Sequence, residues 1–154
     1  MKRLFAAALL LLSATAAVAE PANDKPMRFI GSLNDTVYFL SPDGADGDKP
    51  GEIWVFVAFD KPKEADGDQI VGMWMHQTPD CSGRAITVGE AVLIENDLSV
   101  SYRHDMKQEV IKAAPGSPAE LLLKIVCDGA SPYDGPDAAN LADAVRIAQR
   151  KNQV

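Results

Sequence analysis

A continuous apolar run spans residues 53–59 and reads Ile-Trp-Val-Phe-Val-Ala-Phe. β-branched and aromatic residues dominate this run, which favours an extended strand over a helix. Because both phases of the strand alternation are apolar, we expect neighbouring elements to cover both of its faces. We therefore predict that residues 53–59 form the central strand of a small antiparallel sheet, with a helix packed on at least one side.

Further strand patterns on either side of this run bring the predicted sheet to about six strands. The additional strands are expected at residues 27–31, 37–40, 70–77, 85–94 and 98–103. Loops are expected at 41–51, 61–68 and 78–83, while 104–114 is either a strand end or a loop. Alternation in the strand at 70–77 places Val71, Met73 and Met75 on one face, and Ile70, Trp74 and His76 on the other.

Two helices are predicted after the strands, which makes the fold class α+β. Ser117 as the N-cap, Pro118 at the first helical position and Glu120 form a capping box. The apolar arc of this helix covers residues 121–126, Cys127 lies at its margin, and Gly129 suits the C-terminal cap. A strand over 121–126 is the alternative, but the capping pattern favours the helix. The second helix is expected over residues 137–150, with a narrow apolar stripe at Ala138, Leu141, Val145 and Ala148.

Residues 1–19 carry the pattern of a secretory signal peptide. Lys2 and Arg3 precede an apolar core at residues 4–12, and Ala-Val-Ala at 17–19 forms a small-residue cleavage site. An uncleaved anchor is the alternative, which the short apolar run disfavours. We therefore expect an exported protein, periplasmic or secreted, with no membrane span after cleavage and no cysteine for a lipid anchor.

The expected organisation after the leader is a lead-in at residues 20–26, one domain at 27–129 and a helical tail at 130–154. The chain has 154 residues, and its 22 acidic side chains outnumber 15 basic ones, which gives a formal net charge of −7. Phosphate binding needs a basic face, so this balance argues against nucleic acid as a partner. It also gives no reason to expect attraction to anionic lipid.

Cys81 and Cys127 are the two cysteines of the chain. Both lie in the part that would be exported, and an even pair in an oxidising compartment favours a disulfide over two free thiols. Such a bond would tether the first predicted helix to the sheet.

No catalytic constellation stands out in the sequence. His76 and His104 have no metal-ligand or triad spacing to another suitable residue. Ser82 and Ser117 do not match the Gly-x-Ser-x-Gly pattern of a nucleophile elbow, and no glycine-rich phosphate loop is present. We therefore predict a protein that is not an enzyme and that uses no cofactor.

Three groups of residues are candidates for binding, each with a plainer interpretation. The first group consists of acidic loop residues that could bind calcium: Asp43, Asp46, Asp48 and Glu52. Their spacing does not fit a calcium-binding loop, so we expect a solvated turn without a metal site. A second group would line an apolar ligand groove on the sheet or belong to its core: Trp54, Trp74, Met73 and Met75. A basic group would meet an acidic partner or form a solvated face: Arg103, His104, Lys107 and Lys112.

The order of these signals resembles the surface-adhesin protein E-like domain of bacterial envelope proteins. The resemblance covers roughly residues 27–127, and its most specific part is Pro115-Gly116-Ser117 leading to Ile125-Val126-Cys127. The remaining pieces are the strand at 37–40, the Trp54 strand, Asp80-Cys81 before Arg84, and the turn at 95–97. It implies a small antiparallel sheet with a disulfide-tethered helix, and adhesion to host matrix proteins. The chain departs from the family in lacking a lipid-anchor cysteine and in the 27 residues after Cys127.

Two function classes follow from these observations. The first is an exported, non-enzymatic interaction module of the bacterial envelope, adhesin-like, whose partner is a protein or an envelope component. The alternative is a periplasmic small-ligand carrier or enzyme that uses the apolar Trp/Met face. A packed face without a cavity would argue against this alternative.

Overall fold

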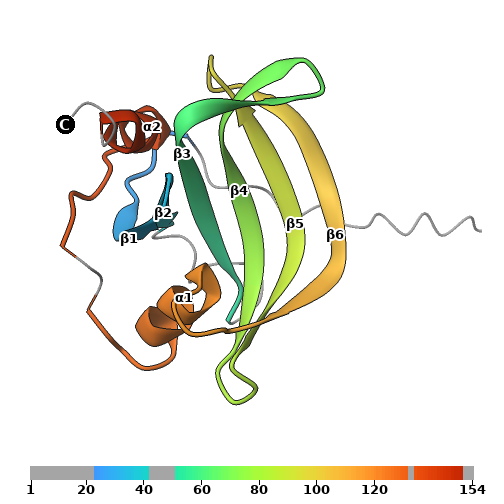
Figure 1. Ribbon diagram of the computed structural model, residues 1–154, viewed down its shortest axis with the longest axis vertical. Coiled ribbons are helices and arrows are strands. Elements are labelled where there is room, and N and C mark those ends of the chain that lie inside the picture. The colour runs from blue at the N-terminus through green and yellow to red at the C-terminus, as the bar shows by residue number, and fades with distance from the viewer. Residues whose placement is uncertain (1–22, 42–50, 132–133, 151–154) are drawn as a thin grey trace, which may run out of the picture.

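In the part of the chain that the structure describes, six antiparallel strands follow one another as a meander, each paired with the next, and two helices complete the fold (Figure 1). The computed structural model describes residues 23–41, 51–131 and 134–150. The strands are β1 (Arg28–Leu33), β2 (Thr36–Leu40), β3 (Ile53–Ala65), β4 (Asp68–Asp80), β5 (Ala85–Glu95) and β6 (Val100–Lys112). The helices are α1 (Pro118–Val126) and α2 (Leu141–Arg150). This confirms the predicted α+β class.

Some of the predicted features lie outside the described residues. They are the signal peptide, most of the 41–51 loop with Asp43, Asp46 and Asp48, and residues 151–154.

The curved sheet carries an apolar core on each of its two faces. On the α2 face, α2 packs against β3 and β2 over side chains such as Trp54, Phe56 and Trp74. On the α1 face, α1 lies against β1 and β5 over side chains such as Val55 and Val57. Every residue of the segment 53–59 is buried, because alternate side chains enter the two cores. The predicted central strand, covered on both faces, is confirmed.

Three strands run further than the apolar pattern predicts. The expected loop at 61–68 is wrong, because β3 and β4 stay paired to Ala65 and Asp68, and Asp66-Gly67 alone make the turn. Both turn residues have positive φ (52° and 93°), as a two-residue hairpin turn requires. Likewise β4 continues to Asp80, and the ambiguous segment 104–114 is strand as far as Lys112. These extensions are largely exposed, so no alternation of apolar residues marks them.

A β-bulge corrects the predicted faces of β4. Its pairing with β5 shifts register between Ile70 and Gly72. Ile70 therefore joins Met73 on the α1 face, and Val71 joins Trp74 on the α2 face. The prediction had assigned Ile70 and Val71 the opposite way, because strict alternation does not allow for an extra residue in one strand.

The first helix begins where its capping pattern predicts. The Ser117 hydroxyl accepts the Glu120 backbone N–H at 3.2 Å, and the Glu120 carboxylate accepts the Gly116 N–H at 2.7 Å. Gly129 follows the helix with φ 66°, a left-handed conformation that ends a helix readily. The predicted helix over residues 117–127 is thereby confirmed.

The second helix begins later than predicted, at Leu141 instead of residue 137. Asp137 does not enter the helix, because its carboxylate accepts the backbone N–H of Phe29 at 2.8 Å. Ala138 forms a bridge with Met27, and the Asn140 side chain accepts the Asp143 N–H at 2.9 Å. The buried side chains of α2 belong to the α2-face core, so the packed unit extends past the predicted boundary at 129.

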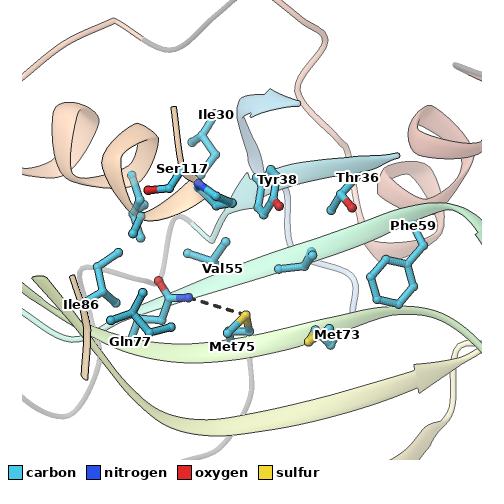
Figure 2. A pocket seen from close by; sticks show the side chains of 15 residues that line it. Ile30, Thr36, Tyr38, Val55, Phe59, Met73, Met75, Gln77, Ile86 and Ser117 are labelled. Carbon is cyan, nitrogen blue, oxygen red and sulfur yellow. Dashed lines mark hydrogen bonds between the residues drawn. The ribbon is translucent and has the colours of Figure 1, made fainter. Parts of the chain in front are cut away.

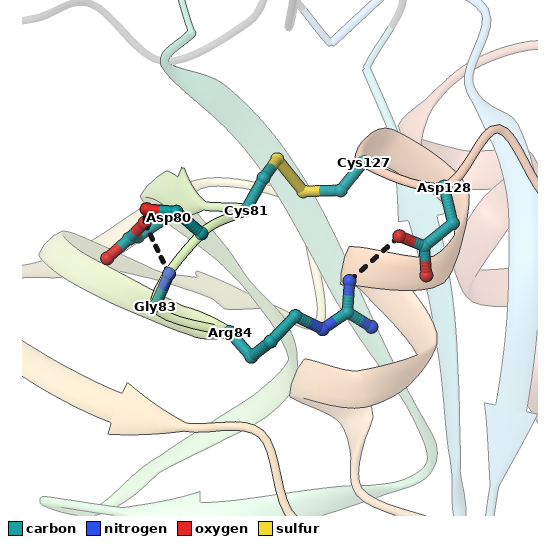
Figure 3. The surroundings of a disulfide bond; sticks show 7 residues. Asp80, Cys81, Gly83, Arg84, Cys127 and Asp128 are labelled. Atoms are coloured by element: carbon teal, nitrogen blue, oxygen red, sulfur yellow. Dashed lines mark hydrogen bonds and ion pairs between the residues drawn. A yellow bond between two sulfur atoms is a disulfide. The ribbon is translucent and has the colours of Figure 1, made fainter.

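The predicted disulfide joins the β4–β5 turn to the end of α1 (Figure 3). The Cα atoms of Cys81 and Cys127 lie 5.5 Å apart. Beside the bond, the Arg84 guanidinium meets the Asp128 carboxylate at 2.9 Å, so a covalent bond and an ion pair link the same two segments. This confirms the tether between the helix and the sheet.

Candidate binding sites

A cavity of ≈ 410 Å³ lies on the α1 face, between the curved sheet and α1 (Figure 2). All six strands and α1 contribute to its wall. Its apolar lining residues are Ile30, Val55, Val57, Phe59, Met73, Met75, Ile86, Ile111, Pro118, Ala119 and Leu122. Volumes of about 300–1,000 Å³ are typical of sites that hold small molecules, so this cavity is large enough for one.

Four polar side chains interrupt the apolar wall: Thr36, Tyr38, Gln77 and Ser117. Gln77 is 7 % exposed, and its side-chain oxygen has no hydrogen-bond partner among the described groups. Among the described residues, the amide nitrogen donates to the Met75 sulfur at 3.7 Å, and Figure 2 shows the oxygen on the side away from Met75. Burial also raises the pKa of the Tyr38 hydroxyl, so that group stays neutral.

The four residues proposed as one apolar ligand face do not share a face. Met73 and Met75 line the cavity. Trp54 and Trp74 lie on the α2 face, 3 % and 1 % exposed, with their rings edge to face at 6.5 Å. Because α2 covers that side, the two tryptophans belong to a packed core. The sequence pattern did not single out Gln77 or Tyr38, since long-range pairing brings them to the cavity.

A histidine and carboxylates gather at one end of the α2 face. The His76 Nε2 lies 3.2 Å from a Glu52 carboxylate oxygen, and the His76 ring packs against the Trp54 ring at a tilt of 43°, with 4.9 Å between the ring centroids. Burial raises the pKa of Glu90, which pairs with Arg103 at 3.1 Å, while nearby His76 opposes that shift. These pairs connect neighbouring strands, and the apolar cavity lies on the opposite face. Within the described part of the chain, no three His, Cys, Asp or Glu side chains gather as a metal site requires.

The strand β6 forms one edge of the sheet, and no described strand pairs with its outer side. Among the described residues, the large apolar side chains that stay exposed all lie on this strand. They are Val100 (40 %), Tyr102 (56 %), Val110 (60 %) and Ile111 (38 %). An edge that presents both apolar side chains and unpaired backbone groups is suited to pairing with another chain.

The predicted basic group lies on this same strand: Arg103, His104, Lys107 and Lys112. It is not a uniform patch, because Arg103 pairs with Glu90 and the Lys107 N–H donates to Asp105 at 2.8 Å. The His104 ring lies 6.0 Å from the Tyr102 ring. Lys107 and Gln108 both have positive φ, so a bulge divides the edge into two short segments.

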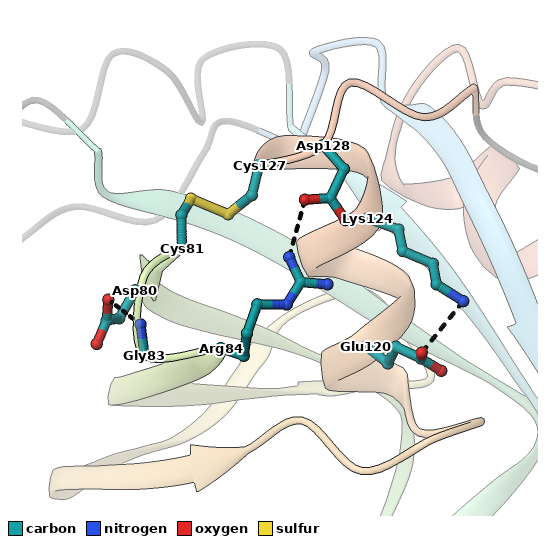
Figure 4. A network of polar contacts seen from close by, with 8 residues as sticks. All are labelled: Asp80, Cys81, Gly83, Arg84, Glu120, Lys124, Cys127 and Asp128. Carbon is teal, nitrogen blue, oxygen red and sulfur yellow. Dashed lines mark hydrogen bonds and ion pairs between the residues drawn. A yellow bond between two sulfur atoms is a disulfide. The ribbon is translucent and has the colours of Figure 1, made fainter.

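Polar contacts also order the β4–β5 turn and α1 near the disulfide (Figure 4). The Asp80 carboxylate accepts the Gly83 N–H and the Ser82 hydroxyl, both at 2.8 Å, and the Gly83 contact is the main cause of the lowered pKa of Asp80. On the helix itself, Lys124 pairs with Glu120 at 3.2 Å. The turn that carries Cys81 is therefore ordered by its own hydrogen bonds.

No helix within the described residues is long and apolar enough to cross a membrane.

Comparison with known proteins gives a family match. The family model described as surface-adhesin protein E matches residues 31–128, well over half of the chain. Among solved structures, crystal form II of Haemophilus influenzae protein E is similar at 13 % sequence identity, with 74 % of this chain and 98 % of that chain covered and a TM-score of 0.45. No curated protein matches the chain.

Proposed function

Because the chain belongs to the surface-adhesin protein E family, we propose that it is an exported, non-enzymatic binding module of the bacterial envelope. Its partner is an extended segment of a protein, which pairs with the outer edge of β6. The observation that carries this proposal is the gathering of exposed apolar side chains on that edge strand.

The edge of β6 supplies the two contributions that strand addition uses. Backbone groups on the unpaired side give hydrogen bonds, and alternate side chains give specificity. Tyr102 is the expected anchor, because its ring is 56 % exposed and supports no core. The bulge at Lys107 and Gln108 limits the pairing surface to the short segment 100–105, which is how edge strands avoid uncontrolled aggregation.

Charge contributes little to recognition along the pairing segment 100–105. Arg103 pairs with Glu90 at 3.1 Å, and Asp105 is the acidic residue of the segment. The exposed apolar side chains of Val100 and Tyr102 therefore carry the recognition, and the partner that fits this edge is an extended apolar segment.

Export is supported by the leader pattern at residues 1–19 and by the Cys81–Cys127 disulfide, because such bonds persist in oxidising compartments. A non-enzymatic role is supported by the family to which the chain belongs. The family is described as a surface adhesin. Adhesion to host matrix proteins, which the sequence resemblance implies, makes these the first partners to test.

The binding proposal can be tested with the mature protein and immobilised laminin, fibronectin and collagen. We expect wild type to bind at least one of them, and Tyr102→Ala to bind at least tenfold more weakly, as loss of an interface anchor does. Arg150→Ala, at the exposed end of α2, is the control and should bind as wild type does. Equal binding by wild type and Tyr102→Ala would refute the role of β6, and no binding to any matrix protein would refute the adhesin assignment.

Surface exposure has a separate test in intact cells. Protease added outside the cells should remove the protein, read out by an antibody, while a cytoplasmic marker stays intact. Protection until the cells are lysed would contradict attachment at the surface.

A further inference from the structure

We propose that the cavity on the α1 face binds a small, uncharged, apolar molecule that carries one hydrogen-bond donor. Of β6 the cavity uses Ile111, outside the segment 100–105 that we assign to a protein partner, and the site does not depend on that assignment.

The requirement for a donor comes from Gln77. Gln77 lies in the cavity wall and is only 7 % exposed, and its side-chain oxygen has no hydrogen-bond partner among the described groups. A buried acceptor without a partner is costly, so native structures nearly always satisfy such groups. The Met75 sulfur, a weak acceptor, takes the amide N–H of Gln77 and leaves the oxygen available. A hydroxyl or N–H group on a ligand would complete this arrangement.

The requirement for an uncharged, apolar body comes from the rest of the wall. None of the described residues that line the cavity is charged. A charged ligand would lose its hydration there without gaining a partner. Met73 and Met75 lie side by side on the floor in Figure 2, and their unbranched side chains adapt to ligands of different shape.

The cavity also reaches the surface. Ile111 and Pro118 line it and are themselves exposed, so a ligand can enter where the end of β6 leads into α1. The disulfide holds α1 in place at the Cys127 end, opposite this opening along the helix.

A fluorescent probe tests the site directly. N-phenyl-1-naphthylamine is uncharged and apolar, carries a single N–H, and becomes brighter when it leaves water. We expect saturable binding of one molecule per chain. The N-methyl derivative, which lacks the donor, should bind about fivefold more weakly, as the loss of one hydrogen bond predicts. In Gln77→Leu this preference should disappear, so that both probes bind with similar affinity.

Two variants fill the cavity from different elements, so that a folding defect in one does not decide the result. Val57→Phe on β3 and Ala119→Phe on α1 should each weaken binding of both probes at least tenfold, with circular dichroism confirming the fold. Tyr102→Ala should bind the probes as wild type does, which excludes the exposed apolar edge of β6 as their site. The proposal is overturned if wild type shows no saturable binding, or if folded cavity-filling variants bind normally. It is also overturned if Gln77→Leu keeps the preference for the N–H probe.

Discussion

Removing the Cys81–Cys127 disulfide should lower the free energy of unfolding by about 4 kcal/mol. The bond closes a loop with a sequence separation of 46 residues. In the chain-entropy model, opening a loop of this length returns about 13 cal/mol/K to the unfolded chain, which is about 4 kcal/mol at 25 °C. Native domains are stable by only about 5–15 kcal/mol, so this bond contributes a large part of the total.

The native structure should survive the loss of the bond, because other interactions also hold α1. Leu122, Leu123 and Ile125 are buried against the sheet, and Arg84 pairs with Asp128 next to the disulfide. Burying an aliphatic side chain of this size contributes about 1.5–3 kcal/mol, so three of them together outweigh the covalent link in docking the helix. The effect of the disulfide on the free energy of unfolding is therefore expected to arise mainly in the unfolded state.

The assay is urea denaturation of the mature protein and of the Cys81→Ala/Cys127→Ala variant, followed by circular dichroism. A reductant should shift wild type toward the variant and leave the variant unchanged, which controls for effects of the substitutions. A loss below about 1 kcal/mol with unchanged native spectra would refute the chain-entropy reasoning. Loss of hydrogen-exchange protection in α1 of the folded variant would show instead that the bond is needed to dock the helix.

Three further predictions concern stability. Gly72→Ala should cost about 2 kcal/mol in thermal unfolding, because the added Cβ would lie 2.6 Å from the Phe56 ring and 2.7 Å from the Val57 carbonyl oxygen. Gly89→Ala meets only side-chain atoms at 3.3 and 3.4 Å and should cost less. Ser117→Ala should lower the free energy of unfolding by about 1 kcal/mol in urea denaturation, because the helix cap is lost. Ser117→Asp should keep most of the stabilisation that the cap provides, because aspartate also caps helices. Several carboxylates have lowered pKa values, so the folded state binds fewer protons than the unfolded state. Their contribution to the free energy of unfolding should be present above about pH 4.5, and this free energy should fall as the pH drops below 3.8. A urea midpoint that does not change between pH 5 and pH 3 would contradict this assignment, which rests on Asp35, Asp80, Asp97, Glu120 and Asp143.

Local signals made much of the fold predictable. The apolar run at 53–59 identified the central strand, because its short length and its β-branched and aromatic residues favour a buried strand over a buried helix. Ser117, Pro118 and Glu120 located the start of α1, because capping depends on residues close together in the chain. The two cysteines indicated the tether because the predicted leader pointed to an oxidising compartment, where an even pair of cysteines favours a disulfide.

Features set by pairing between strands could not be predicted in the same way. The bulge between Ile70 and Gly72 places Ile70 and Val71 on the faces opposite to those predicted, and nothing in the local pattern marks it. Asp137 is a residue type that favours a helix start, yet its carboxylate accepts the backbone N–H of Phe29, 108 positions earlier in the chain. The extended end of β3 is exposed, so backbone pairing determines it and apolar periodicity does not.

The cavity is also formed by strands that pair over long distances in the sequence, and its shape depends in part on the disulfide. An apolar space of ≈ 410 Å³ costs stability and would be expected to collapse unless its walls are fixed. The floor is fixed from behind by the α2-face core, where Phe56 and Trp74 pack at 5.0 Å beneath α2. The roof includes Ala119 and Leu122 of α1, whose far end is fixed by Cys127. Opening the disulfide should therefore weaken probe binding through a looser roof even where the helix remains folded, whereas unchanged affinity in the cysteine-free variant would mean that apolar packing alone keeps the cavity open.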